Sequence, residues 1–203
     1  MTTALHEDRL AAVIRAVDAT AARTILDLGC GTGDLILRLA IRPHITRITG
    51  LDTDLASLRG LQARLADLPA DIRAKVQVAQ ASMTQAHRNL RGHDCACLVE
   101  TIEHLPPGDI NRLERALFAD MRPQHVIVTT PNADYNPVLG VPAHRFRHPD
   151  HHFEWSRVRF GQWADGVAAR SGYTVTRCDV AGAHPTLGGA SQMAIFRRSD
   201  QDP

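Results

Sequence analysis

The sequence predicts an α/β fold in which one mostly parallel sheet is covered by helices on both faces. Three observations support this class. Apolar segments of strand length alternate with amphipathic segments of helix length, a glycine turn joins the first such pair, and no repeat or low-complexity tract interrupts the pattern. At roughly 150 residues per domain, the 203 residues predict one domain over 1–203.

The N-terminal half begins with an amphipathic helix and then repeats strand and helix. Residues 6–17 place apolar side chains on one helical face, and the short apolar strand 24–28 runs directly into the glycine turn GCGTGD. The elements expected after it are helix 34–41, strand 46–51, helix 54–66, strand 75–80 and strand 94–99.

The C-terminal half contains a long segment without a regular pattern. Pro106 and Pro107 suit the first turn of a helix, and strand 125–130 ends at Pro131. Residues 131–155, here called the insert, are irregular, and a loop of that length in a compact domain is usually functional or mobile. Helix 156–170 and strands 172–178 and 192–197 bring the expected sheet to seven strands.

Composition excludes several classes of protein. With 44% apolar and 22% charged residues, the chain is neither a disordered tail nor a disulfide-stapled miniprotein. Its uncharged apolar runs are too short for a membrane helix, and the start MTTALHEDRL lacks the apolar segment of a signal peptide. The four cysteines form no C-x-x-C pair and are expected to be small core residues in a reducing compartment. We therefore expect a cytoplasmic protein with no membrane partner.

The net charge of +1 conceals a local cluster. Residues 144–159 (HRFRHPDHHFEWSRVR) hold four arginines and four histidines against two acids. Five of the nine aromatic residues lie between Phe146 and Trp163. Phe153 and Trp155 are expected to pack the insert onto the sheet, and Trp163 is expected in the core because it lies at helical spacing from Phe160.

The glycine turn indicates a ligand with a cationic end. Glycines allow positive φ and close backbone approach, but Asp34 stands where a dinucleotide site would have a third glycine. An acid facing a pyrophosphate is electrostatically unfavourable, so Asp27 and Asp34 favour the ammonium of an amino acid. Asp52, at the end of the second strand, occupies the position that binds ribose hydroxyls in such folds.

The sequence DLGCGTGD followed by GLD resembles the first two motifs of class I S-adenosylmethionine-dependent methyltransferases. The resemblance implies a Rossmann-like class I methyltransferase fold. It also implies that the methionine pocket is shaped by Asp27, Gly29, Gly31 and Gly33, that Asp52 binds the ribose, and that Ser82 and Met83 lie near the adenine.

A second cluster follows the fourth strand, in the sequence Glu100-Thr-Ile-Glu103-His104. If the chain turns helical there, Glu100, Glu103 and His104 share one face at the edge of the sheet where ligands bind. Carboxylate and imidazole ligands suit Mn²⁺, Co²⁺ or Fe²⁺. The alternative is a solvated helix start whose acids complement the helix dipole.

The chain also resembles the small-RNA 3′-terminal ribose 2′-O-methyltransferases. The shared residues are Glu100-Thr-Ile-Glu103-His104, TTPNADYN at 129–136 and RHPDHHFEW at 147–155. The resemblance implies that Glu100, Glu103, His104 and His151 are the metal ligands and the catalytic residues. His148 and His152 are then supporting or RNA-contacting residues, and either is an alternative ligand.

The resemblance implies methyl transfer from S-adenosylmethionine to the 2′-hydroxyl of the terminal ribose of RNA. A divalent ion, with Mn²⁺ expected ahead of Mg²⁺ or Co²⁺, would chelate the 2′ and 3′ hydroxyls and lower the pKa of the first. Two alternatives are a metal-independent methyltransferase acting on a small molecule and a non-catalytic protein that binds RNA ends.

The insert is the expected RNA-facing surface. Arginine side chains would meet phosphates, and Phe146 or Tyr135 would stack on an unpaired base. The arginines in question are Arg145, Arg147, Arg157 and Arg159.

Two departures from the family shape further expectations. No long N-terminal region that works with RNA repair fits before residue 24, so a repair or processing partner would be a separate protein. Gln85-Ala86-His87 stands where an acid is expected after the serine, which leaves Ser82 and Met83 as the predicted adenine contacts.

Overall fold

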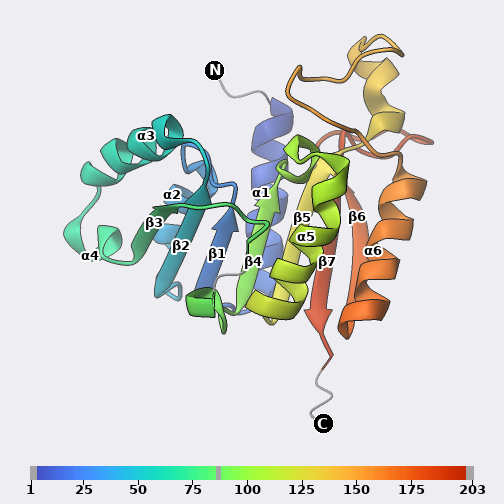
Figure 1. The fold of residues 1–203 in the computed structure, drawn as a ribbon. Helices are drawn as coiled ribbons and strands as arrows, with labels where there is room; N and C mark the ends of the chain where they lie inside the picture. Colours follow the sequence, from blue (N-terminus) through green and yellow to red (C-terminus); the bar gives the residue numbers. More distant parts are fainter. Residues whose placement is uncertain (1–3, 86–87, 200–203) are drawn as a thin grey trace.

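Seven strands form one sheet in the order β3-β2-β1-β4-β5-β7-β6 in the computed structural model, which describes residues 4–85 and 88–199 (Figure 1). The strands are β1 Thr24–Leu28, β2 Arg47–Asp52, β3 Val76–Gln80, β4 Cys95–Val99, β5 His125–Pro131, β6 Tyr173–Val180 and β7 Ser191–Arg198. Strands β1 to β5 pair in parallel, and β7 runs antiparallel to both β5 and β6. This arrangement confirms the predicted class I methyltransferase architecture.

Helices cover both faces of the sheet (Figure 1). The α-helices are α1 Ala4–Ala19, α2 Asp34–Ala40, α3 Leu55–Ala66, α4 Ala70–Arg73, α5 Ile110–Glu114 and α6 Arg157–Ser171. Short 3-10 helices are η1 Arg88–Leu90, η2 Ile102–His104, η3 Pro107–Asp109 and η5 Ala133–Leu139, and a π-helical segment, η4 Arg115–Met121, continues α5. The sequence pattern predicted neither α4 nor the π-helical geometry.

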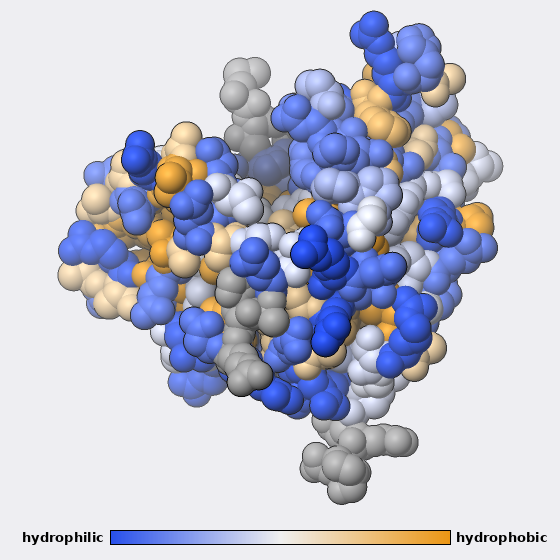
Figure 2. All heavy atoms as spheres, in the orientation of Figure 1, coloured by the Kyte–Doolittle hydropathy of each residue, from blue (hydrophilic) through white to orange (hydrophobic). Residues whose placement is uncertain are grey.

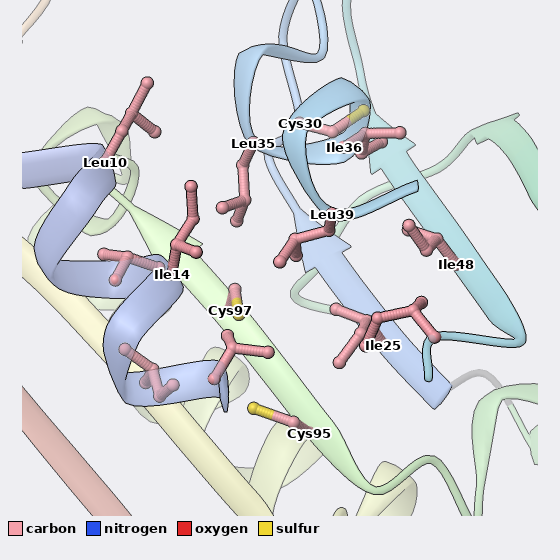
Figure 3. Packing of buried hydrophobic residues seen from close by; sticks show 14 of the residues in the cluster. Leu10, Ile14, Ile25, Cys30, Leu35, Ile36, Leu39, Ile48, Cys95 and Cys97 are labelled. Atoms are coloured by element: carbon pink, nitrogen blue, oxygen red, sulfur yellow. The ribbon is translucent and has the colours of Figure 1, made fainter. Parts of the chain in front are cut away.

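Alternation along the strands divides the core in two. Ile25, Cys95 and Cys97 point to the face covered by α1, α2 and α3, where they belong to one buried cluster with Leu10 and Leu39 (Figure 3). Their strand neighbours, such as Leu26 and Leu98, belong to the other cluster, which packs under α5 and α6. Because side chains of a strand alternate between the two faces, both faces of these strands are apolar and buried. The buried cysteines Cys30, Cys95 and Cys97 are core residues, as predicted, whereas Cys178 is exposed.

The insert leaves and rejoins the sheet at one point. Asn132 and Trp155 form a parallel β-bridge, and the Ala133 nitrogen donates to the Trp155 carbonyl at 3.1 Å. Phe153 is buried and Trp155 partly buried against the α5 and α6 cluster, so the prediction that they pack the insert onto the sheet is confirmed. The insert is less irregular than predicted, because η5 forms its first third.

The face that carries α5 and α6 is largely polar. Figure 2 shows hydrophilic residues over most of the face formed by α5 and α6. Within residues 4–85 and 88–199, no helix combines the length and apolar character needed to cross a bilayer.

Candidate active site

The glycine turn between β1 and α2 has the backbone that its sequence demands. Gly29, Gly31 and Gly33 have φ values of 80°, 51° and 83°. A Cβ on Gly29 would lie 2.5 Å from Thr101 Cγ2, and one on Gly33 would lie 2.2 Å from Leu61 Cδ1. At Gly31 the same atom would meet nothing within 4 Å. Gly29 and Gly33 are therefore required by packing, whereas Gly31 borders open space.

Asp52 holds this turn from the neighbouring strand. One of its carboxylate oxygens accepts the Gly31 N–H at 2.7 Å, and the other accepts the Asp54 N–H at 2.9 Å. Each oxygen keeps a further lone pair. Asp52 therefore lies beside the turn and retains acceptor capacity for a ligand, and its role in ribose binding stays a prediction.

Asp27 is buried at the end of β1, with 3% of its surface exposed. Burial, and then the charge of Asp52, raises the pKa of Asp27 to about 7. Asp34, the other acid predicted to favour a cationic ligand, already pairs with Arg64 at 2.7 Å. Across residues 4–85 and 88–199, no cationic side chain lies within ion-pair distance of Asp27, so Asp27 is the acid still able to receive one.

Met83 and Ser82 lie after β3, beside the same turn. The Met83 methyl group lies 3.2 Å from the position of a Cβ on Gly29, and the Ser82 hydroxyl shares a 2.8 Å hydrogen bond with Thr84. Met83 therefore borders the glycine turn. Ala86 and His87, which replace the acid expected in this segment, lie outside the described residues.

A second group of polar side chains lies next to the glycine turn. Glu103, His104 and His151 each present one potential metal-binding atom, and these atoms all lie within 4.8 Å of one another. The first two come from η2, and the third comes from the insert. The His152 N–H donates to the Glu103 carbonyl at 2.8 Å and so fixes the insert against η2.

Glu103 is fully buried. Its Oε2 accepts the Thr130 hydroxyl at 2.9 Å, whereas its Oε1 has no hydrogen-bond partner within the described part of the chain. Burial, and then the charge of Glu100, raises the pKa of Glu103 well above its usual value. A buried carboxylate oxygen without a donor indicates a place for a cation.

The imidazole of His104 is poised to be neutral. His104 is exposed on one side, and partial burial of its ring, followed by the charge of His151, lowers its pKa. The centroids of the His104 and His151 rings lie 4.8 Å apart, edge to face. A neutral imidazole is the form that binds a metal ion. The donor set of carboxylate oxygen and imidazole nitrogen, without thiolates, therefore fits Mn²⁺ and similar divalent ions.

Glu100 is positioned differently from the other predicted ligands. Its backbone is left-handed, with φ at 52°, and η2 begins only at Ile102, so no α-helix aligns the motif on one face. Its Oε2 pairs with Arg9 at 3.2 Å and accepts the Ser191 hydroxyl at the same distance. Glu100 Oε1 is buried without a partner among the described residues, so Glu100 stays a predicted fourth ligand outside the group of three.

His151 is held by an acid that sequence reasoning missed. Its Nδ1 lies 2.6 Å from Oε1 of Glu154, whose side chain is 1% exposed. Glu154 also accepts the Asn136 side-chain amide at 2.6 Å and the Arg147 backbone N–H at 2.7 Å. These contacts leave the other ring nitrogen of His151 to face the cluster. The spacing of Glu154, three residues after His151, was the available signal.

Two residues of the insert that were predicted to contact RNA face the protein interior instead. Arg147 does not face phosphates, because its guanidinium donates to the carbonyls of Asn132 and Ala190 and to the Asn136 side chain. Tyr135 is buried against Ala181 and Ala190, so it is not available to stack on a base.

The remaining basic and aromatic side chains of this surface are more exposed. Arg157 is exposed but pairs with Asp179 at 3.5 Å. Arg145 and Arg159 are exposed, as is Phe146 at 46%. His148 and His152 are also exposed, and neither belongs to the group of three that includes His151.

The support that Glu154 gives His151 generates a prediction that needs no enzyme assay. Glu154→Gln should weaken Mn²⁺ binding by about 10–100-fold, because it removes the charge that orients the ring. Isothermal titration calorimetry with Mn²⁺ measures this. Asp71→Asn, at an exposed carboxyl of α4, should leave the affinity unchanged. Equal affinities of the two variants would contradict the assigned role of Glu154.

Comparisons with known proteins agree with this geometry. A family described as a methyltransferase domain matches residues 25–124. Among solved structures, the methyltransferase domain of bacterial CtHen1-C is 34% identical, covers 96% of this chain and 99% of that chain, and superposes with a TM-score of 0.87. A second, of the small RNA methyltransferase HEN1, is 28% identical over 97% of this chain and 26% of that chain, with a TM-score of 0.86.

Curated relatives give the same family. The small RNA 2′-O-methyltransferases of Xenopus tropicalis and Tetrahymena thermophila are 36% and 35% identical over 96% of this chain. They are covered over 55% and 50% of their own length, so the chain spans about half of each. The chain belongs to the small RNA 2′-O-methyltransferase family and corresponds to its methyltransferase domain.

Proposed function

We propose that the protein transfers the methyl group of S-adenosylmethionine to the 2′-hydroxyl of the 3′-terminal ribose of RNA. The observation that carries this proposal is the contact between the two sites. Thr101, between Glu100 and Glu103, lies so close to the glycine turn that a Cβ on Gly29 would meet its methyl group at 2.5 Å. The cofactor turn therefore packs against the segment that carries Glu100, Glu103 and His104.

The cofactor side of the site is the glycine turn with its acids. Asp27 would pair with the ammonium of the methionine part, and Asp52 would accept hydrogen bonds from the ribose hydroxyls. The backbone at Gly29, Gly31 and Gly33 would leave room for the methionine part. Ser82 and Met83 would border the adenine. The open space at Gly31 supports this placement, because it is the one glycine of the turn at which a Cβ would meet no protein atom within 4 Å.

The second side would hold a divalent ion. Glu103, His104 and His151 would bind it, with Glu100 Oε1 as the fourth ligand. When bound, such an ion supplies Lewis-acid chemistry, since it orients the vicinal hydroxyls of a terminal ribose and lowers the pKa of the attacking one.

The residues of the chain itself do the positioning. Thr130 holds Glu103, and Glu154 with Asn136 holds the His151 ring. Side chains fixed in this way would hold the attacking hydroxyl in one place. Such positioning accelerates a reaction because the entropy of bringing the two reacting groups together is already lost on binding. An internal nucleotide has no free 3′-hydroxyl, so a site built for the vicinal pair would select the terminus.

RNA is the proposed partner, and the insert is its proposed surface. Arg145 and Phe146 are exposed on it and offer a phosphate contact and a stacking face. A separate repair or processing protein stays a prediction.

The metal side predicts a simple dependence of activity. With labelled S-adenosylmethionine and a short RNA, chelation of divalent ions should abolish transfer, and Glu103→Ala or His151→Ala should lower it by about a hundredfold or more. His44→Ala, at an exposed histidine paired with Asp18, should leave it unchanged. Both site variants should still bind S-adenosylhomocysteine, which shows that they fold. Undiminished transfer by both would contradict the metal-site assignment.

The cofactor side predicts a pH dependence. Because the pKa of Asp27 is raised from 3.8 to about 7, folding favours its protonated form, and its contribution to stability is lost as the pH rises through 7. A ligand ammonium favours the ionised form instead. As the pH is raised towards 7, the affinity for S-adenosylhomocysteine should therefore increase by up to about tenfold per pH unit, and it should level off above pH 7.

Calorimetry between pH 5.5 and 8.5 measures this slope. Asp27→Asn should lower the affinity and flatten the profile, whereas Asp71→Asn, at an exposed carboxyl of α4, should keep it. A profile that Asp27→Asn leaves unchanged would show that Asp27 does not meet the ammonium.

A further inference from the structure

A groove between α5 and α6 contains an aromatic site that the proposed chemistry does not use. It has a volume of about 450 Å³, and its walls include Phe153, Trp155 and Trp163. The chain has two tryptophans, and both line this groove. Their packing on the core explains why they are partly buried but not why they border an open space.

The aromatic rings form a stepped surface. Trp155 stacks on Phe153 with ring centroids 4.5 Å apart and lies 5.4 Å from Trp163. The guanidinium carbon of Arg159 lies 6.0 Å from the centre of the Trp155 ring. Flat aromatic faces next to a guanidinium group are the usual elements of a stacking site for nucleobases.

The charges of the groove favour an anion. Glu114 accepts Trp163 Nε1–H at 2.9 Å and Arg170 at 2.9 Å, so Glu114 and Arg170 neutralise each other. Arg159 has no carboxylate within ion-pair distance in the part of the chain that the structure describes. One exposed, unpaired cation therefore stands beside the indole rings. A ligand that satisfies both features carries a flat ring and a negative charge.

One wall of the groove lies close along the chain to the proposed reaction centre. Phe153 follows His151 by two residues, a span of at most about 7 Å between their Cα atoms. His152, between them, is fixed to Glu103 through its backbone N–H. If the terminal ribose lies at His151, the RNA chain that runs past Phe153 and Trp155 contains the nucleotides upstream of that ribose.

We propose that this groove binds an unpaired nucleotide upstream of the 3′ end, with its base stacked on Trp155 and its phosphate paired with Arg159. The inference rests on the proposed function, whose terminal ribose sets the register. It assigns Trp155, Trp163 and Arg159 to substrate binding, away from the reacting atoms.

The two tryptophans provide a direct test. Intrinsic fluorescence of the whole chain is titrated with a six-nucleotide single-stranded RNA, and then with RNAs that carry one abasic site at each position in turn. We expect quenching by the intact RNA and its loss at one upstream position. At that position KM for methyl transfer should rise about tenfold with kcat unchanged, as for the loss of one stacked base.

A charge variant completes the test. Arg159→Gln should raise KM and reduce the salt dependence of binding, whereas Arg73→Gln, at an exposed arginine of α4, should do neither. Methyl transfer without fluorescence quenching would contradict nucleotide binding in the groove and leave the proposed function standing. Quenching that a fully abasic RNA reproduces would have the same meaning. Base-dependent quenching without any methyl transfer would retain the groove and overturn the proposed function.

Discussion

The burial of one carboxylate organises this molecule. Glu103 lies wholly inside the protein, with one oxygen bound to Thr130 and the other unpartnered among the described residues. Isolating an ionised carboxylate costs several kcal/mol, so the group must either keep its proton or share its charge with a cation. The raised pKa of Glu103 expresses the first state, and His104 and His151 make the second possible.

The insert is built around that requirement. It leaves the sheet at Asn132 and returns at Trp155, which brings His151 to Glu103 across the end of the fold. Arg147 is partly buried inside it, where three hydrogen-bond acceptors and the charge of Glu154 compensate the desolvation that lowers its pKa. The near-zero net charge of the chain therefore combines the acidic residues at the edge of the sheet with the basic residues of the insert. One of these basic residues, Arg147, faces inward.

Much of the fold could be predicted from the sequence, because alternation and turn chemistry are local properties. The strand pattern placed Thr24–Leu28 correctly. The glycine turn after this strand indicated the edge of the sheet at which a ligand is expected to bind. The proposed ligands Glu103 and His104 could be named because they are neighbours just after a strand end. His151 could be named only through its motif, since no local rule states that a loop 47 residues later returns to the same place.

The errors also have physical causes. Arg147 and Tyr135 were expected to face RNA, but main-chain carbonyls and a buried apolar cluster hold them inside, and such tertiary contacts leave no periodic trace in a sequence. Glu100 depends on a left-handed backbone that its residue type does not signal. Its pairing with Arg9 joins a strand end to the first helix, residues far apart in sequence.

The proposed site is expected to recognise the two vicinal hydroxyls of a terminal ribose together. Mass spectrometry of three RNAs tests it most directly: one ending in a 2′,3′-diol, one in a 3′-deoxyribose and one in a 3′-phosphate, all of which keep the 2′-hydroxyl. We expect the diol to be methylated and the other two RNAs to react at least about a hundredfold more slowly. Equal methylation of all three would contradict it.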